Sequence, residues 1–175
     1  MALPKITFNI ATTGLGRLAE AIQKIPGFVL TGATVATKVT IGQPYQIFSL
    51  KEAEDLGIEK IGVNAFAYKH IAAFFNTAGQ GAPLWFMLVS DATTMTQMAD
   101  RTENYARKLV EDAGNIRVLG LLKEATGTET ITNGLDEDVA TAVVKAQELA
   151  DYFAAKYFPV RVILSGNRFN GTVAD

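Results

Sequence analysis

The chain has 175 residues, enough for one domain with a substantial hydrophobic core. Hydrophobic residues make up 49% of it and charged residues only 19%, below the share of about a quarter that is typical of soluble domains. The low charge indicates that part of the surface is covered, for example by copies of the same chain. The net charge of −2 and the absence of a lysine and arginine cluster argue against a nucleic-acid-binding surface.

The composition excludes further classes of protein. Because the chain has no cysteine, disulfides, thiolate catalysis and Cys-ligated metals are excluded. The first residues show no secretion signal, and no stretch reaches the roughly 18 apolar residues of a membrane span. We therefore expect a cytoplasmic product that is not inserted into a membrane.

Extended segments are predicted near the N-terminus. Residues 5–11 alternate between apolar and polar side chains, as in a half-buried or edge strand, and the apolar ones are Ile6, Phe8 and Ile10. A second strand is expected over residues 28–35, interrupted by Gly32, and residues 36–44 are irregular. These patterns assign residues 1–44 to an N-terminal β arm with an irregular segment, and residues 45–175 to an α/β domain.

Helix start and stop patterns follow in the second part of the chain. Residues 45–48 form a short extended run, and Ser49 with Glu52 predicts a capping box for a helix that ends by Gly57. Asn64 can cap a helix that continues to about residue 77. One row of that helix is largely aromatic and contains Phe66, His70 and Phe74.

Long helices and apolar strands then alternate. Continuous apolar runs at residues 84–89, 116–122 and 160–164 predict strands that are covered on both faces. Helices are expected between them, over residues 94–113 and 136–157, and residues 125–134 are a polar loop or a hairpin tip. The predicted fold class is therefore α/β, with a mainly parallel sheet flanked by helices and an extended N-terminal β arm.

The predicted core of the last helix comprises Val139, Val143, Leu149, Tyr152 and Phe153. Gly114 can end the helix before it. The acidic run at residues 136–138 is interpreted as a helix cap and not as a metal site, because the helix macrodipole favours negative charge at that end.

Residues 14–19, GLGRLA, fit the spacing of a dinucleotide-binding fingerprint. That motif requires a buried strand before it and a long helix after it, with an acidic residue further on for the ribose. Here the preceding strand alternates, Pro26 shortens the following helical segment, and no acidic residue lies between Glu20 and Glu52. A glycine-rich turn is therefore the better interpretation.

Polar residues at the carboxyl ends of the strands form a weaker candidate ligand site. Ser90 and Asp91 follow one apolar strand, and Ser165 and Arg168 follow another, so they could converge at one edge of the sheet. The simpler interpretation is that Ser90 and Asp91 turn the chain and cap the next helix. The only histidine, His70, lies between phenylalanines and is expected to be buried or at an interface.

The order of segments resembles a known family. The N-terminal MALPKITFNIATTGLGR, then FVLTGATV, then GQPYQIFSL running into KEAEDLGI, resembles the front of a contractile phage tail sheath protein. The similarity is greatest to the sheath-like family DUF2586. A helix with an aromatic face and a strand like LWFMLV follow in the expected order.

The resemblance implies a structural role, with no catalytic residue, cofactor or metal. It implies stacked hexameric rings of this protein around a tail tube protein, assembled from the bacterial cytoplasm into a phage tail or injection particle. Terminal arms would add strands to neighbouring sheets, for which Ile6, Phe8 and Ile10 are the candidate residues. The alternative is a small-molecule or nucleotide-binding α/β domain that uses the carboxyl ends of its strands.

Sheath proteins are usually longer, with a C-terminal domain that faces the tube. The present chain stops after its third apolar run, without a closing helix. We therefore expect either that it is part of a longer product or that this member of the family lacks that half.

Overall fold

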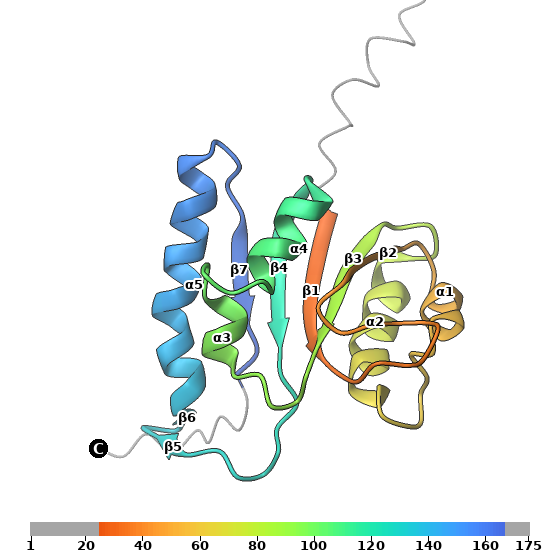
Figure 1. Cartoon of the computed structure of the whole chain (residues 1–175), viewed down its shortest axis with the longest axis horizontal. Coiled ribbons are helices and arrows are strands. Elements are labelled where there is room, and N and C mark those ends of the chain that lie inside the picture. Colours follow the sequence, from red (N-terminus) through yellow and green to blue (C-terminus); the bar gives the residue numbers. More distant parts are fainter. Residues whose placement is uncertain (1–24, 167–175) are drawn as a thin grey trace, which may run out of the picture.

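The computed structural model describes residues 25–166. The strands are β1 (Ile25–Thr31), β2 (Pro44–Ile47), β3 (Leu84–Val89), β4 (Ile116–Leu122), β5 (Ile131–Thr132), β6 (Leu135–Asp136) and β7 (Arg161–Leu164). The helices are α1 (Leu50–Asp55), α2 (Ala65–Ala78), α3 (Met95–Ala99), α4 (Ala106–Ala113) and α5 (Glu137–Ala155). Figure 1 shows them arranged around one sheet, with the β5–β6 hairpin at its lower end.

The main sheet has the order β2-β3-β1-β4-β7. β1 pairs in parallel with β3 and with β4, and β4 pairs in parallel with β7, while β2 is antiparallel to β3 at one edge. The prediction of an α/β fold with a mainly parallel sheet is confirmed.

β1 lies in the centre of this sheet, which corrects the predicted division of the chain at residue 44. Residues 25–31 belong to the α/β domain, because their strand is hydrogen-bonded on both sides. The strand also begins earlier than predicted and ends before Gly32. Pro26 is accommodated near its start, at a shift of register against β4.

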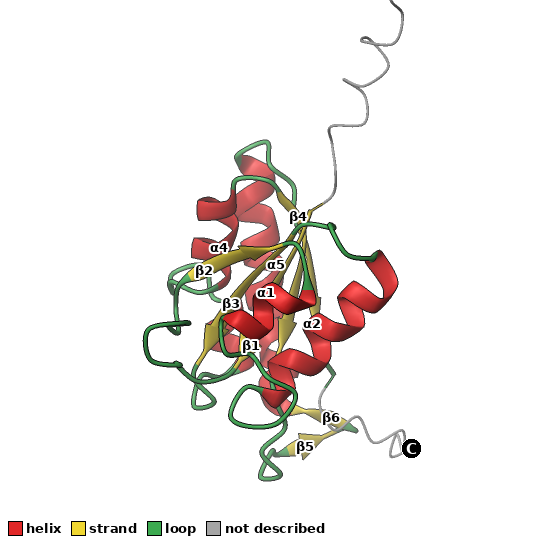
Figure 2. Cartoon of the chain, turned by 90° about the vertical axis from the view of Figure 1, so that its right-hand side faces the viewer, coloured by secondary structure: helices red, strands yellow, loops and turns green. Residues whose placement is uncertain are grey.

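Helices form a layer on each side of the sheet (Figure 2). The side chains of α1 and α2 pack in one core with Leu30, Phe86 and Leu88, and those of α3, α4 and α5 in a second core with Val29 and Met87. The connections from β1 to β3 and from β3 to β4 run in opposite directions and over opposite faces. This is the arrangement that right-handed crossovers require.

The start of α1 is confirmed in position. The Ser49 hydroxyl accepts a hydrogen bond from the Glu52 N–H at 3.2 Å. In a capping box, the Glu52 carboxylate would accept a hydrogen bond from the N–H of the cap residue Ser49. Here it accepts from the N–H of the preceding residue, Phe48, at 2.9 Å. The helix ends as predicted, since Gly57 follows it with a φ of +82°.

The single helix predicted over residues 94–113 is wrong, because the structure has the two shorter helices α3 and α4 there. Asp100 ends α3 with a ψ of 122°. One carboxylate oxygen of Asp100 accepts hydrogen bonds from the N–H and the hydroxyl of Thr102, both at 2.8 Å. These bonds lower the pKa of Asp100 to about 2 and favour a turn over a continuing helix. Gly114 ends α4 in a left-handed conformation, as predicted.

β7 is less buried than its apolar sequence predicts. It lies at the edge of the sheet, and Ile163 is 51% exposed. An apolar run alone does not distinguish a central strand from an edge strand that a helix covers on one side only.

α5 begins after Asp136, as predicted, and Val139, Leu149 and Phe153 are buried. Val143 is exposed, contrary to the predicted core, and Tyr152 is half-buried. The hairpin alternative for residues 125–134 is confirmed in part, because β5 and β6 pair through Asn133 and Gly134, both with positive φ.

The strand predicted over residues 5–11, the glycine-rich turn and Arg168 lie outside the described residues. Within residues 25–166, no helix has both the length and the apolar character that a membrane crossing requires.

Candidate functional site

In a sheet of this order, ligands usually bind at the carboxyl ends of the strands where the connections diverge to opposite faces. Here that point lies between β1 and β4. The connection that leaves β1 carries α2 over one face of the sheet, whereas the connection that leaves β4 carries α5 over the other face. The residues that occupy this position decide whether a ligand has room there.

Hydrogen bonds within the chain occupy this point. The buried hydroxyl of Thr31, at the end of β1, accepts from the N–H of Glu124 at 2.9 Å. The N–H of Gly32 donates to the carbonyl of Val89 at 2.8 Å. The ends of three neighbouring strands are therefore joined directly, by groups that would otherwise be available to a ligand.

Asn64 fixes the loop that follows β1. It occupies the cap position of α2, as predicted, but its side chain makes no capping hydrogen bond. Instead its carbonyl oxygen accepts from the Ala33 N–H at 2.8 Å, and its amide donates to the Ala33 carbonyl at 3.1 Å. Asn64 is only 2% exposed, so this side chain acts as an internal clamp between two segments.

The candidate ligand residues lie apart in the sheet. Ser90 follows β3 and Ser165 follows β7, with β1 and β4 between them. Three strand spacings amount to about 14 Å, too far for both hydroxyls to contact one small group. The Ser90 hydroxyl accepts from the N–H of Ala92 at 3.3 Å, and the Ser165 hydroxyl from the N–H of Lys123 at 3.3 Å. Asp91 is exposed.

The polar cluster at this edge is built instead around Asp138, which the sequence reasoning assigned only to a helix cap. Its carboxylate accepts from the N–H of Met95 at 2.6 Å, from the N–H of Thr96 at 3.1 Å and from the Thr96 hydroxyl at 2.8 Å. The Lys123 ammonium lies 3.4 Å from the same carboxylate. Asp138 thus joins the starts of α3 and α5 to the end of β4.

Burial acts to raise the pKa of Asp138, because it disfavours the charged carboxylate. The hydrogen bonds from Met95 and Thr96 and the charge of Lys123 outweigh this effect, so the pKa of Asp138 is lowered. A carboxyl whose pKa is lower in the folded state stabilises the fold at neutral pH. That stabilisation is lost as the pH falls through the folded-state pKa.

The variant Asp138→Asn is expected to lower the free energy of unfolding by about 2 kcal/mol at pH 7, because a charged acceptor and its ion pair are lost. The difference in the free energy of unfolding should shrink as the pH falls below about 4. In this range the Asp138 carboxyl of the wild type is protonated first in the unfolded chain, and at lower pH also in the folded protein. Urea unfolding at several pH values measures it. The exposed Asp91→Asn serves as the control, and an equal, pH-independent loss in both variants would contradict the assignment.

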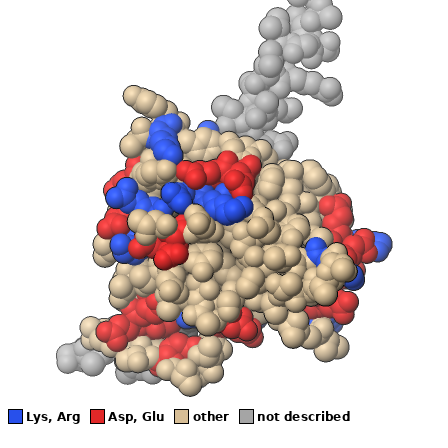
Figure 3. Space-filling view, viewed as in Figure 1, with Lys and Arg blue, Asp and Glu red and all other residues tan. Residues whose placement is uncertain are grey.

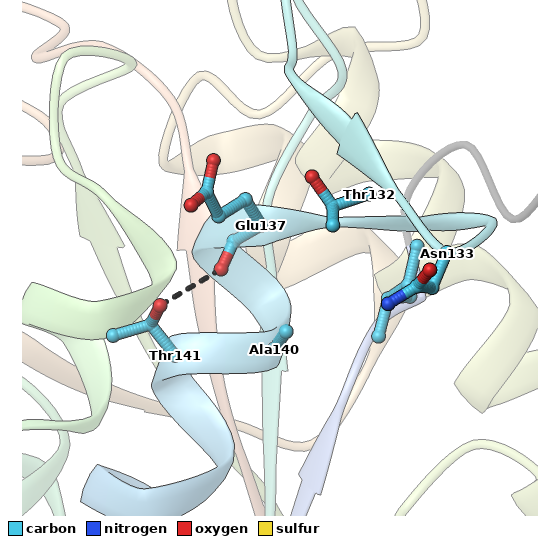
Figure 4. A pocket seen from close by; sticks show the side chains of 6 residues that line it. Thr132, Asn133, Glu137, Ala140 and Thr141 are labelled. Carbon is cyan, nitrogen blue, oxygen red and sulfur yellow. Dashed lines mark hydrogen bonds between the residues drawn. The ribbon is translucent and has the colours of Figure 1, made fainter.

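Two cavities of about 440 Å³ each lie beside this cluster. The first is polar and is lined by Thr94, Thr96, Lys123, Thr126, Thr128, Glu129, Thr130, Asp136, Glu137, Asp138 and Thr141. The second lies between the β5–β6 hairpin and the first turn of α5 (Figure 4). In it the Thr141 hydroxyl donates to the Glu137 carbonyl at 2.9 Å, an ordinary contact within a helix.

Acidic residues at the start of α5 act as helix caps, as predicted. The carboxylate of Asp136 accepts from the N–H of Asp138 at 3.0 Å. Among the residues that the structure describes, no group of three or more His, Asp and Glu side chains could hold a metal ion.

His70 is half-buried on α2, with its ring 4.6 Å from that of Phe66 in an edge-to-face contact. Burial lowers the pKa of His70, and the nearby charge of Lys69 adds to the effect. The residue therefore belongs to the aromatic side of α2, as its phenylalanine neighbours predict.

The exposed surface is uneven in charge. In Figure 3 the charged side chains gather in separate groups, and a broad uncharged area lies between them. Large exposed apolar residues lie at several separate places: Ile61 and Val63 before α2, Val143 and Val144 on α5, Tyr157 after α5, and Ile163 on β7. A third cavity, of about 390 Å³, lies between α5 and β7 and is lined in part by Val143.

Comparison with known proteins identifies the family. The N-terminal domain of DUF2586 matches residues 3–174, almost the whole chain. No curated protein and no solved structure matches it. The chain therefore belongs to the DUF2586 family, as an N-terminal domain of that family.

Proposed function

We propose that this chain is a structural subunit of a contractile phage tail sheath, or of a related injection apparatus, and that it assembles with copies of itself around an inner tube. The proposed partners are further copies in stacked hexameric rings and a tail tube protein. The proposed location is the bacterial cytoplasm before assembly, and the phage tail or injection particle afterwards. In this role the protein is not an enzyme and needs no cofactor.

The observation that carries the proposal is the distribution of polar and apolar groups. The carboxyl edge of the sheet uses its polar groups for contacts within the chain, as Thr31 and Asn64 illustrate. Large apolar side chains are exposed instead at separate places, which include Ile61 and Val63 before α2 and Ile163 on the edge strand β7. Different apolar surfaces on one molecule suit head-to-tail contacts, which build rings and helical assemblies.

The N-terminal segment supports the same role. Ile6, Phe8 and Ile10 alternate with polar residues, the pattern of a strand that can add to the sheet of a neighbour. At both edges of the described sheet, β2 and β7 each pair with one strand only. Such edges offer backbone groups for a further strand.

Deletion of residues 1–11 is expected to leave the α/β domain folded and to abolish assembly of the full-length protein. The reason is that these residues lie outside the described domain, whereas backbone pairing by the arm would hold the copies together. Sedimentation velocity measures assembly, and circular dichroism measures folding.

Point variants provide the matched control. Ile6→Asp combined with Ile10→Asp should prevent assembly, whereas Thr7→Asp combined with Asn9→Asp, on the other side of the strand, should permit it. Normal polymerisation of the truncated protein would show that the arm is not the link.

A ligand-binding domain is the alternative function, and the polar cavity beside Lys123 and Asp138 is the observation that favours it. A small polar ligand could bind between the threonines that line this cavity. A thermal-shift screen with nucleotides and small polar organic molecules tests the alternative. A shift that disappears in Lys123→Ala would support ligand binding, whereas unchanged melting temperatures across the screen would count against it.

A further inference from the structure

Tyr157, directly after α5, is the most exposed large apolar residue of the part of the chain that the structure describes. It is 95% exposed, so its ring contacts almost nothing in its own molecule. Its backbone has a φ of +60°, a left-handed conformation that is rare for a bulky residue. The reason for a tyrosine at this position therefore has to be sought outside the packing of the single molecule.

The backbone around Tyr157 forms a Schellman motif that ends α5. The N–H of Tyr157 donates to the carbonyl of Ala154 at 3.0 Å, and the N–H of Phe158 donates to the carbonyl of Phe153 at 2.9 Å. The rings of Phe153 and Phe158 pack edge-to-face with centroids 6.3 Å apart, the apolar contact that accompanies this motif. Glycine usually occupies the left-handed position, because it has no Cβ. A tyrosine there makes the fold less stable than a glycine would, and such strain points to a function.

A strained and exposed tyrosine suits a contact with another molecule. Tyrosine is enriched among the residues that carry most of the binding energy at interfaces, since it buries a large ring and keeps a hydroxyl for a hydrogen bond. Its exposed neighbours Ala154, Ala155 and Pro159 carry no charge. A partner can therefore approach the ring closely.

The opposite end of α5 holds a cavity that can receive such a ring. It is the cavity of about 440 Å³ between the β5–β6 hairpin and the first turn of α5 (Figure 4), within the size range of pockets for small ligands. Leu135 and Ala140 give it apolar walls. Asn133 and Glu137 also line it and offer hydrogen-bonding groups to a phenol hydroxyl.

The two ends of α5 also differ in charge. Figure 3 shows mostly acidic side chains at the lower end, around the hairpin. Among the described residues that line the two cavities there, Lys123 is the only cation, beside the acidic Glu129, Asp136, Glu137 and Asp138.

Basic residues flank the loop that presents Tyr157. The Arg117 guanidinium lies 3.8 Å from the centre of the Phe158 ring, and Arg161 is exposed at the start of β7. Lys156 is ion-paired with Glu111 at 3.1 Å, so the two arginines provide the positive charge. The loop and the cavity are therefore complementary in charge as well as in shape.

We propose that Tyr157 of one copy inserts into the cavity between the β5–β6 hairpin and α5 of the next copy, so that copies of this chain stack head to tail. The 19 residues of α5 span about 28 Å, so the two surfaces are well separated and one copy can engage two neighbours. A contact between two different surfaces propagates from copy to copy, whereas a two-fold contact stops at a dimer.

The inference rests on the proposed function in one respect, namely that the chain associates with copies of itself. The contact requires neither residues 1–11 nor a tube protein. It adds to the proposed pairing by residues 1–11 and does not replace it, because a single small interface is weak.

Sedimentation velocity of the 175-residue chain tests the contact, at concentrations up to about 1 mM because the interface is small. The parent chain should form dimers and longer species as its concentration rises. Tyr157→Gly should stay monomeric, and its melting temperature should rise by about 2 to 4 °C because the backbone strain is relieved. A parent that stays monomeric, or a Tyr157→Gly variant that associates like the parent, would overturn the proposal.

Thr37→Gly is the matched control, because Thr37 is also exposed and has a φ of +63°. It should likewise raise the melting temperature, but its association should equal that of the parent. Tyr157→Phe keeps the ring and should retain most of the association. Equal loss of association in Thr37→Gly would contradict a specific role of Tyr157.

A mixture of two variants tests the pairing of the surfaces. Ala140→Lys places a long charged side chain in the cavity and keeps Tyr157, whereas Tyr157→Gly keeps the cavity. Each variant alone should be monomeric, and an equimolar mixture should form dimers with one copy of each and no longer species. Ala73→Lys, at an exposed position of α2, should associate like the parent. A mixture that contains only monomers would overturn the proposal.

Electron microscopy of the full-length protein separates the failure of this contact from the failure of the proposed function. Sheaths formed equally by the parent and by Tyr157→Gly would overturn the contact and leave the proposed function standing. A full-length protein that forms no sheath would contradict the proposed function, whereas the contact would stand or fall on the sedimentation results.

Discussion

Replacement of Leu30 by alanine is expected to lower the free energy of unfolding by about 3 kcal/mol, a large part of the stability of a domain of this size. Leu30 is fully buried on the central strand and packs in the core of α1 and α2. Its truncation leaves a cavity, because strands hold it in place on both sides. Urea unfolding followed by circular dichroism measures the loss.

The same experiment tests whether β1 belongs to the domain. Ile61→Ala removes an apolar side chain that is 85% exposed, and it should change the free energy of unfolding by no more than about 0.5 kcal/mol. If Leu30→Ala were as mild as this control, β1 would not be the central strand.

Asn64→Ala is expected to cost about 2 to 3 kcal/mol of stability. The variant leaves the N–H and the carbonyl of Ala33 without their partners, in a part-buried place where water replaces them only incompletely. Loss of a helix cap would cost less and would leave Ala33 unaffected. Hydrogen exchange separates the two effects, since the Ala33 amide should lose protection in the variant well beyond the loss of global stability.

Asn76→Ala is the matched control, because Asn76 is an exposed residue of the same helix. It should be neutral or slightly stabilising, since alanine favours helix more than asparagine does. Equal effects of the two substitutions would refute the internal clamp at Asn64.

Local patterns sufficed for most of the fold. The apolar runs of β3 and β4 and the caps at Ser49 and Asp136 mark elements that the structure confirms. These features depend on neighbours in sequence, so a pattern reveals them. The position of β1 depends on pairing with strands far along the chain, and Pro26, which the sequence pattern assigns to the end of the preceding segment, lies within the strand.

The roles of Asn64 and Asp138 show what sequence patterns miss. Both residues occupy or flank helix starts, and both predictions of a cap placed them correctly along the chain. Their strongest contacts reach segments 31 residues away for Asn64 and 42 or 43 residues away for Asp138. Only tertiary structure brings such partners together, so no local pattern could have indicated them.

The candidate ligand residues illustrate the same limit. Carboxyl ends of parallel strands share one edge, which made convergence of Ser90 and Ser165 reasonable. The strand order placed β1 and β4 between them, and order cannot be deduced from the apolar runs alone. The polar residues that do meet at this edge are Lys123, directly after β4, and Asp138, in the first turn of α5, which form an ion pair.

Electron microscopy of the full-length protein, produced together with the proposed tail tube protein, tests the proposed function most directly. A sheath subunit should form rings, tubes or stacked polysheaths in negative stain. Removal of residues 1–11 should leave only dispersed particles. A protein that remains dispersed under every condition, with the tube protein present, would contradict a role as a sheath subunit.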